Sequence, residues 1–566
     1  MFSFYVYTDN FVFNINVVVL LGKSIMQFKK NLKKYPWQLW AIIFTAVIVQ
    51  MILFHYKELL HVDELFSFGT ANGDKGVFLR YSAEEFDNQF FYKEDFKNYL
   101  LLQHSTFADM WHNLRLDTHM PLYFVLFRLF SIPVAPAFSL ISVMTLNVLL
   151  FIVFLFGVYR LFMSLFCCKE TAVVGVFIVA FMLPVLSLAV FMRMYLLWMV
   201  FCVYLVDYVV KYLFSDKWRT KGLIGIGIFS FLQILTHFYG LIFGFVLTVV
   251  GCLLLLIMKR YKQTACLAGV MLISVLCAWM VFPAMIDIGL HGERGVQFRA
   301  RLPELVYALG SVLKYQMPLF IQTIFGHYLV AAVVFVIYFT VVSLGIKKKI
   351  LSVEERIYIA FFSLIFVCYG VLSALFQPNM GCWQIRYFAP LIVMEVVLII
   401  YTVSIICRLF EMKKFNFLLF LYLIAFVSAI YSAMVENAFW AKRDEVYAGN
   451  TYQRFENIFK DAHIWWGLGC SPVWMMHIVM DKLIETEQLF VLSDVNDPNF
   501  MRYAKQEKEN GHYAYYFLPH TQEQAPEGAV IWIKEKTGRN SYYMFTFKDE
   551  KYGSFLAASV FLVAPY

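Results

Sequence analysis

Long apolar runs separated by short polar turns dominate the sequence. The first strong run covers residues 37–54, where only Gln38, Thr45 and Gln50 are polar. At about 1.5 Å of rise per residue, it is long enough to cross a hydrocarbon core about 30 Å thick. Further runs cover 138–164, 171–190, 194–213, 222–238, 240–258, 264–286, 318–345, 355–376, 385–407 and 415–436. This pattern predicts an α-helical polytopic membrane protein with about 11–13 transmembrane helices.

The composition agrees with a membrane protein. Of the 566 residues, 61% are hydrophobic and 15% are charged, whereas soluble proteins are about 45–50% apolar and about 25% charged. The net charge of +8 comes from short Lys and Arg clusters between apolar runs, so it indicates membrane orientation and no nucleic-acid partner. The ten cysteines include no C-x-x-C pair, which argues against a zinc site or a disulfide framework.

The basic clusters predict which loops face the cytoplasm. Lys29, Lys30, Lys33 and Lys34 follow Met26 and precede the first run, so residues 1–36 are expected to be an N-terminal cytoplasmic segment. The turns at 211–221, 259–262, 347–349 and 408–414 are also basic. The loops at 57–118, 287–317 and 377–384, and everything after residue 436, are therefore expected on the non-cytoplasmic side.

Two segments leave alternatives open. Residues 1–25 have no basic region before their short apolar run, so they are not expected to be a signal peptide. They are either dispensable or an overlong start that precedes Met26. The segment 121–133 is short for a span, and counting it as one reverses every later helix; either it is re-entrant or another run does not cross.

The chain divides at about residue 436, where the hydropathy falls. We expect a transmembrane domain over 37–436, with 57–118 as its first outer loop, and a C-terminal soluble α/β domain over 437–566 on the same outer side. The predicted strands of this domain cover 489–492, 529–533, 542–547 and 555–563. No internal repeat supports an inverted-repeat transporter.

Two adjacent carboxylates, Asp63 and Glu64, follow the first span directly. A carboxylate at a membrane boundary is partly desolvated, so we expect a raised pKa, with which a base role becomes chemically accessible. The alternative is that the pair only ends a helix and holds the loop in water. The polar segment that follows leads to Asp117 and His119, which belong to the stretch Asp-Thr-His-Met-Pro-Leu-Tyr.

Other polar groups fall at the outer ends of predicted spans. They are Arg193, Tyr195, His237, Arg386 and Tyr387, with Glu293 and Arg294 in the 287–317 loop. An arginine fork donates two charge-assisted hydrogen bonds to a phosphate, and neighbouring tyrosines can donate to its other oxygens. Singly, each Arg-Tyr pair is also explained by snorkelling beside an aromatic belt. Together on one face, these groups favour a site for a lipid phosphate.

These motifs resemble the GT-C superfamily of integral-membrane glycosyltransferases. The branch most similar is the family 39 type, which includes protein O-mannosyltransferases, lipid A aminoarabinose transferases and related bacterial enzymes. The resemblance covers residues 37–400, through Asp63-Glu64, Thr118 to Tyr123, Arg193-Met194-Tyr195, Thr236 to Tyr239 and Arg386 to Pro390. Met120 stands where the family has a first proline, and the C-terminal domain is not covered.

The resemblance implies an inverting transfer of a sugar from a polyprenyl- or dolichyl-phosphate to a lipid, glycan or protein acceptor. It implies Asp63 as base with Glu64 in support, and Arg193, Tyr195, His237, Arg386 and Tyr387 at the donor phosphate. Asp117, His119, Glu293 and Arg294 are acceptor or loop candidates. A second loop carboxylate has the candidates Glu84, Glu85, Asp87, Asp109 and Asp117.

The sequence also leads to expectations about the cofactor, the location and alternative functions. The sequence requires no cofactor and leaves a divalent metal ion open. The expected home is a bacterial inner membrane, or the ER membrane in a eukaryote. The alternatives are a flippase or transporter for a lipid-linked sugar and an oligosaccharide ligase or polymerase with a lipid-diphosphate donor.

Overall fold

A computed structural model describes most of the helical region of the chain. The described residues are 35–57, 60–74, 89–116, 119–136, 140–214, 219–292, 328–376 and 386–412, seven strands outside these ranges, and isolated positions between them. Two short strands, β1 (Tyr5–Thr8) and β2 (Phe11–Asn14), pair as an antiparallel hairpin near the N-terminus.

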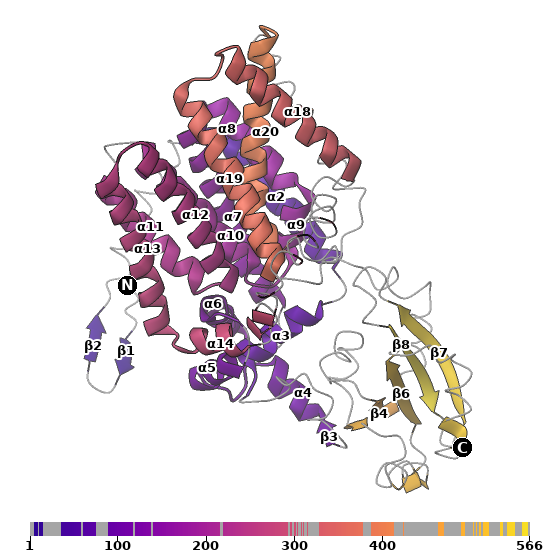
Figure 1. Ribbon diagram of the computed structural model, residues 1–566. Coiled ribbons are helices and arrows are strands. Elements are labelled where there is room, and N and C mark those ends of the chain that lie inside the picture. The colour runs from indigo at the N-terminus through magenta and orange to yellow at the C-terminus, as the bar shows by residue number, and fades with distance from the viewer. Residues whose placement is uncertain are drawn as a thin grey trace.

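Seven helices among the described residues are long and apolar enough to cross a membrane. They are α2 (Trp37–His55), α7 (Leu140–Phe166), α10 (Tyr195–Phe214), α12 (Phe238–Ile257), α13 (Tyr261–Val281), α19 (Val353–Phe376) and α20 (Ala389–Leu409). The bent pair α8 (Lys169–Phe181) and α9 (Leu183–Val190) is an eighth if it forms one span. The prediction of a mostly helical, polytopic membrane protein is confirmed (Figure 1).

The predicted number of spans is larger than this. Helices α11 (Arg219–Ile234) and α18 (Tyr328–Lys347) occupy predicted spans, but their described apolar parts are shorter than a full crossing. The last predicted span, 415–436, lies outside the described residues except for Leu423. The total of about 11–13 helices therefore stays a prediction.

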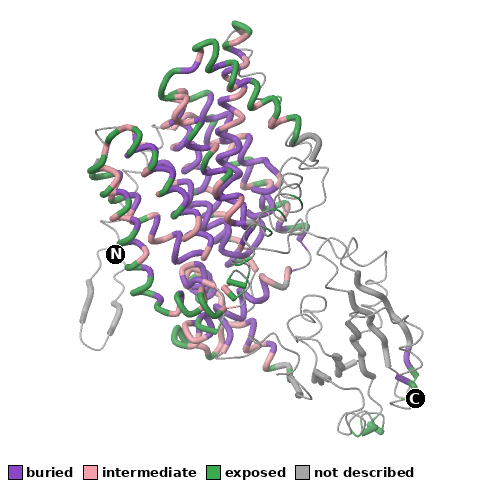
Figure 2. Tube along the Cα trace, in the orientation of Figure 1, coloured by how far each residue is buried: buried purple, intermediate pink, exposed green. Residues whose placement is uncertain are grey.

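Helix α10 lies at the centre of the bundle. Its Trp198 and Tyr212 are fully buried, whereas Phe44, Ile141 and Met280 on surrounding helices are 68%, 74% and 74% exposed. Figure 2 shows this pattern as a buried centre inside a partly exposed outer layer. Large apolar side chains on the outside suit a bundle whose solvent is lipid, since lipid tails are as apolar as leucine.

Tight turns join helices at one end of the bundle, called here the basic end. After α12, Lys259 takes a left-handed conformation with φ 57°, and Arg260 N–H donates to Leu255 O at 2.8 Å. This is a Schellman cap, which satisfies the last carbonyls of a helix. Lys349, after α18, repeats it with φ 56°. These residues belong to the basic turns that the sequence analysis places in the cytoplasm.

The predicted continuous span 171–190 is wrong in one respect, because the chain breaks there. Helices α8 and α9 meet at an angle of 61° at Met182, and Pro184 lies in the first turn of α9. A proline ring clashes with the preceding helical turn and lacks an N–H, so a helix restarts more easily than it continues. The break turns α9 toward the opposite end of the bundle, called here the site end.

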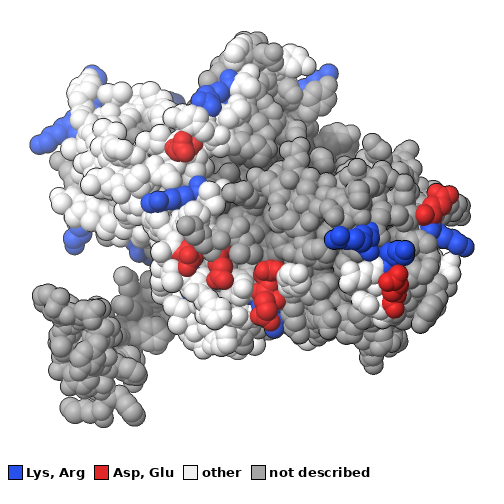
Figure 3. Space-filling model, turned by 90° about the horizontal axis from the view of Figure 1, so that it is seen from below, with Lys and Arg blue, Asp and Glu red and all other residues white. Residues whose placement is uncertain are grey.

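Short helices of the first outer loop cover the site end. They are α3 (Val62–Asn72), α4 (Lys93–Leu100) and α5 (Phe107–Leu116), followed by α6 (Pro121–Ser131) with the 3₁₀ turn η2 (Ile132–Val134) just after this loop, and, from a later loop, α14 (Ala284–His291). Seen from below in Figure 3, this face carries acidic side chains between basic ones.

Helix α6 answers the question that the sequence left open at 121–133. At about 1.5 Å per residue, the 11 residues of α6 cover about half of a ~30 Å core. Near its start, Leu122 N–H donates to Leu235 O at 2.9 Å. Near its end, Arg128 donates to Ala71 O at 2.7 Å, in the first outer loop. Both ends of α6 therefore contact the site end, which supports the alternative that this segment does not cross.

A six-stranded mixed sheet contains the later strands. They are β4 (Ala462–Leu468), β5 (Gln488–Leu492), β6 (Tyr513–Pro519), β7 (Ser541–Lys548) and β8 (Ala557–Val563). The sixth strand, β3 (Gln89–Tyr92), comes from the first outer loop, and the order is β3-β5-β4-β6-β8-β7. Strand β4 runs parallel to β5 and β6, and the other pairs are antiparallel.

The strand predictions are partly right. The predicted strands at 489–492, 542–547 and 555–563 correspond to β5, β7 and β8, whereas β3, β4 and β6 were not predicted. The predicted strand 529–533 is wrong at its end, since Ile533 is helical. Most residues between the strands lie outside the described part of the chain, so a separate soluble α/β domain stays a prediction.

The pairing of β3 with β5 generates a topology prediction. Hydrogen-bonded strands must lie in one compartment, so the first outer loop and the C-terminal sheet face the same side. In a chain whose native cysteines are replaced by serine, cysteines introduced at Ala83 and Asn540 should react with an impermeant maleimide in intact cells. A cysteine at Lys348, in the basic end, should react only after permeabilisation. Protection of either outer position would overturn this topology.

Candidate active site at the site end of the bundle

The two adjacent carboxylates start helix α3 as part of its N-terminal cap. Asp63 N–H donates to His61 Nδ1 at 3.0 Å, and His61 N–H donates to Glu64 Oε2 at 2.8 Å. This reciprocal arrangement is a capping box, with a histidine in the place of the usual serine or threonine. The alternative that the pair only ends a helix and holds the loop in water is therefore wrong, because the pair starts α3 and Glu64 is completely buried.

Asp63 forms an ion pair with Arg386, a residue 323 positions later in the chain. The side chain of Asp63 is 21% exposed, whereas that of Glu64 is completely buried. Burial opposes the charged form of Asp63, but the positive charges of Arg386 and Arg193 outweigh it. The pKa of Asp63 therefore lies well below its usual range and the carboxylate is ionised, which is the opposite of the raised pKa expected for a carboxylate at a membrane boundary.

Glu64 is held from three sides inside the protein. Its Oε1 accepts hydrogen bonds from Lys57 Nζ and from Met192 N–H, the latter at 2.7 Å, while its Oε2 caps His61. Burial raises the pKa of Glu64 and lowers that of Lys57, so each partner depends on the other to stay charged. A carboxylate with these contacts is placed to support the site rather than to meet a substrate.

Arg193 joins the first outer loop to the loop after α9. It is 1% exposed; its Nη1 donates to Ser67 Oγ at 3.1 Å and its Nη2 lies 2.7 Å from His119 Nε2. A guanidinium can only donate, so His119 Nε2 must accept, which requires a neutral ring. His119, predicted as a loop candidate, is thus brought to the arginine predicted for the phosphate.

Aromatic rings surround the other arginine. The guanidinium carbon of Arg386 lies 5.6 Å from the ring centre of Tyr195 and 5.2 Å from that of Tyr387. Tyr195 and Tyr387 meet edge to face at 5.9 Å. Cation–π contacts of this kind hold a cation without consuming its hydrogen-bond donors. The buried Nε of Arg386 has no hydrogen-bond partner among the described residues.

His237 completes the cluster from the turn before α12. Its Nδ1 accepts from Tyr239 N–H at 3.0 Å, and its ring stacks on Trp198 at 5.0 Å. Burial, with the positive charges of neighbouring groups, holds the pKa of His237 well below its usual range. The ring is therefore neutral and carries its proton on Nε2, which leaves a hydrogen-bond donor there.

The structure thus brings eight of the predicted site residues together. They are Asp63, Glu64, His119, Arg193, Tyr195, His237, Arg386 and Tyr387. Asp117, Glu293 and Arg294 lie outside the described residues, as do Glu84, Glu85 and Asp87. Asp109 is described, but its carboxylate caps α5 through Thr106 N–H at 2.6 Å.

Four contributors were not predicted from the sequence. Lys57, His61, Ser67 and Trp198 contact the cluster directly. The position of Lys57, a cation at the outer end of a span, is the only signal that could have indicated a buried partner. Ser67 lies one helical turn after Asp63, and its Oγ donates to Asp63 O at 3.2 Å.

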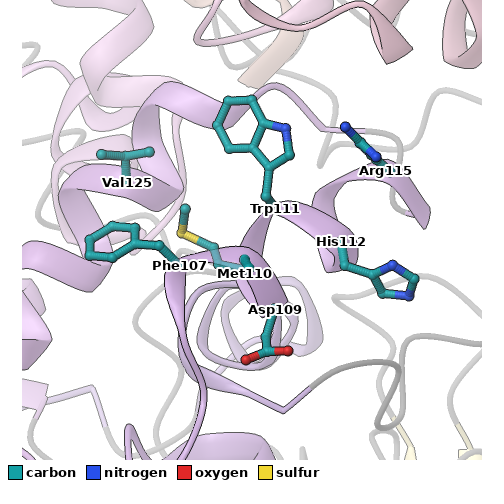
Figure 4. Close-up of a pocket in the computed structure, with 8 residues that line it drawn as sticks. Phe107, Asp109, Met110, Trp111, His112, Arg115 and Val125 are labelled. Carbon is teal, nitrogen blue, oxygen red and sulfur yellow. The ribbon is translucent and has the colours of Figure 1, made fainter.

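A separate cavity lies beside α5 (Figure 4). Its volume is about 650 Å³, and its walls combine Phe107, Met110 and Trp111 with the polar Asp109 and Arg115. None of the clustered residues described above lines it. Among the described residues, no three His, Cys, Asp or Glu side chains are placed to hold a metal ion.

The site therefore combines two kinds of chemistry at the end of the bundle. One ionised carboxylate, Asp63, is partly open, while two arginines, a neutral histidine donor and tyrosines converge beside it. Arginine and histidine donors suit a phosphate, and a partly open carboxylate can accept a proton.

No protein-family model and no curated protein matches the chain. Among solved structures, the chain is similar to ArnT from Cupriavidus metallidurans bound to undecaprenyl phosphate, at 9% identity and a TM-score of 0.41, covering 93% of this chain and 97% of that one. It is also similar to the oligosaccharyltransferase AglB from Archaeoglobus fulgidus with an inhibitory peptide and a dolichol-phosphate, at 12% identity and a TM-score of 0.39, covering 86% and 69%.

A second structure of an Archaeoglobus fulgidus oligosaccharyltransferase, tethered to an acceptor peptide, gives 13% identity and a TM-score of 0.40, covering 92% and 74%. These identities and TM-scores are too low to assign a function, which has to be argued from the side chains of the site.

The turn that carries His237 generates a packing prediction. A Cβ on Gly240 would lie 2.5 Å from Gln233 O, a backbone atom that cannot move aside. Gly240→Ala should therefore displace the start of α12 and lower stability by about 1–3 kcal/mol, measured by thermal unfolding in detergent. Gly269→Ala is the matched control, since its Cβ meets nothing within 4 Å. Equal stability of the two variants would contradict this packing.

Proposed function

We propose that this protein transfers a sugar from a polyprenyl-phosphate donor to an acceptor hydroxyl at the site end of the bundle. The observation that carries the proposal is the convergence of an ionised, partly open carboxylate with two arginines and a neutral histidine, at one end of the long apolar helices. Such a boundary suits a substrate with an apolar tail and an anionic head.

Arg386 and Arg193 are the proposed partners of the donor phosphate. Arg386 is held by the rings of Tyr195 and Tyr387, so its guanidinium can exchange Asp63 for a phosphate without losing those contacts. The phosphate charge is strongest when the lipid leaves, and fixed cations and N–H donors stabilise it at that moment. The Nε2–H of His237 supplies a further donor.

Asp63 is the proposed base. As the acceptor oxygen forms its bond to the anomeric carbon, the acceptor proton passes to Asp63, and the bond from that carbon to the phosphate oxygen breaks. The electron pair leaves with the lipid phosphate. A single displacement of this kind inverts the anomeric configuration, in parallel with carboxylate roles in glycoside hydrolysis.

The donor distinguishes this proposal from its rivals. Purified protein in vesicles should transfer label from a polyprenyl-phosphate sugar to a covalent product. Transfer only from a lipid diphosphate would favour an oligosaccharide ligase, and movement of the lipid across the bilayer with no covalent product would favour a flippase.

One prediction of the proposed function concerns the donor phosphate. Arg386→Ala should weaken binding of a labelled polyprenyl-phosphate sugar by about ten- to a hundredfold, the loss of about 1.5–3 kcal/mol expected for a charged hydrogen bond. Arg386→Lys should restore only part of it, since a point charge lacks the planar fork. Binding is measured by titration, in the wild-type and the Asp63→Asn backgrounds, so that the release of Asp63 is separated from the loss of the cation.

A matched control lies on the same helix. Arg408, at the other end of α20, pairs with Glu355 at 2.8 Å in the basic end. Arg408→Ala should leave donor affinity unchanged. Equal donor affinity in the Arg386→Ala and wild-type proteins would assign Arg386 a structural role.

Another prediction of the proposed function concerns the base. Asp63→Asn keeps the size of the side chain but removes the proton acceptor, so transfer should fall by about 10²–10⁴-fold with little change in donor affinity. Glu64→Gln should lower thermal stability more than Asp63→Asn does, because Glu64 is completely buried. Turnover is measured per folded, detergent-extracted molecule, and full specific activity of Asp63→Asn excludes this mechanism.

The pH dependence gives the same prediction a second measurement. A base works when deprotonated, so kcat/KM is lost as the pH falls through its pKa. Because Arg386 helps to hold the pKa of Asp63 low, the acid limb of the wild type should lie below about pH 4. In Arg386→Gln the limb should move to higher pH. An unmoved limb would separate Arg386 from the titration of Asp63.

A further inference from the structure

Helix α9 ends inside the protein, and side chains from other helices cap it. The last carbonyls of a helix have no partner within that helix. Gln50 Nε2 donates to Ala189 O at 2.8 Å, and Asn147 Nδ2 donates to Phe191 O at 3.0 Å. Gln50 and Asn147, from α2 and α7, are both completely buried. These two amides thus satisfy carbonyls at the C-terminal end of α9, which lies inside the protein.

Lys57 caps the same helix end and, unlike the amides, also contacts Glu64. Its Nζ donates to Val190 O at 3.1 Å and also to Glu64 Oε1, with 1% of its side chain exposed. A cation at a helix C-terminus interacts favourably with the carbonyl end of the helix dipole. Lys57 therefore links the end of α9 to the start of α3.

The link continues to both halves of the site. Glu64 Oε1 also accepts Met192 N–H, next to Arg193, and Glu64 is next to Asp63. Arg193 returns to α3 through Ser67 Oγ at 3.1 Å, which closes a ring of contacts. The spacing between the carboxylate and Arg193 thus depends on one buried ion pair.

We propose that Lys57 is a positioning residue of the site: through Glu64 and Val190 O it sets the spacing between Asp63 and Arg193. The amides of Gln50 and Asn147 hold the same helix end without reaching Glu64. This inference rests on the proposed function only where transfer is the readout. Independently of transfer, the inference states that Lys57 determines the positions of Arg193 and Asp63 in addition to contributing to stability.

The physical reason is the cost of an unpaired buried charge. Removing Lys57 leaves Glu64 buried beside two N–H donors with no cation, so it is expected to take up a proton or move toward water. Movement toward water releases Met192 N–H, and Arg193 follows, whereas protonation turns one Glu64 oxygen into a donor and so weakens its contact with Met192 N–H or with His61 N–H. Removing Gln50 leaves Ala189 O with the second bond from Asn147, at 3.2 Å, so the segment that carries Arg193 keeps its place.

The test compares Lys57→Met with two controls in the full-length protein. Gln50→Met removes a cap of the same helix end, and Lys211→Met removes a lysine paired at 2.6 Å with the buried Asp207 in the basic end. All three should lower the thermal midpoint. Only Lys57→Met should lower kcat per folded molecule, by about ten- to a hundredfold, and affinity for undecaprenyl phosphate, by about tenfold.

A double variant guards against misfolding of the single one. Lys57→Met with Glu64→Gln has no unpaired buried charge, and the amide oxygen of glutamine still accepts from Met192 N–H. It should retain more activity than Lys57→Met, so that the two losses are non-additive. Losses that multiply would contradict the coupling between the two residues.

The remaining outcomes decide between the two proposals. Wild-type activity per folded molecule in Lys57→Met would overturn the positioning role, as would an equal loss in Gln50→Met. If the wild type transfers no sugar, the proposed function fails. Binding of undecaprenyl phosphate then still tests the positioning role of Lys57. Weaker binding in Lys57→Met alone then supports positioning, and equal binding in all variants overturns it.

Discussion

Every backbone carbonyl buried in a membrane bundle needs a hydrogen-bond partner, and this constraint organises the site. In lipid, an unsatisfied backbone group costs several kcal/mol, so a helix that breaks must be capped by its neighbours. Here the C-terminal end of α9, which lies inside the bundle, is capped by Gln50, Asn147 and Lys57. The polar side chains required by that helix end lie beside the residues proposed for catalysis.

The two adjacent carboxylates show how neighbouring residues acquire different roles. They start the same helix, but successive helical residues point about 100° apart, so one meets Arg386 and the other meets Lys57. Asp63 is partly open and ionised, whereas Glu64 is completely buried and used by three donors. Sequence adjacency alone cannot separate these roles, because they depend on which partner each side chain meets, Arg386 for Asp63 and Lys57 with Met192 for Glu64.

Much of the fold could be predicted because lipid imposes a simple rule on sequence. Long apolar runs and basic turns gave the membrane class, most helices and the shared position of Asp63, Arg193, His237 and Arg386. Continuous hydrophobicity could not reveal the break at Met182, since an apolar run looks the same whether straight or bent. The buried partner of Lys57 was equally hidden, because a cation at a span boundary is ordinarily explained by snorkelling.

The strand shared between the first outer loop and the C-terminal sheet has a consequence for biogenesis. Strand β3 is synthesised early, but its partner β5 emerges about 400 residues later, which takes about 20–80 s at about 5–20 residues per second. During that interval the loop that follows Asp63 presents an unpaired strand edge outside the membrane. Such an edge can pair with the wrong strand, including a strand of another chain. The C-terminal part of the chain therefore completes the sheet to which β3 belongs, and a nascent chain that stalls before β5 leaves β3 without its partner strand.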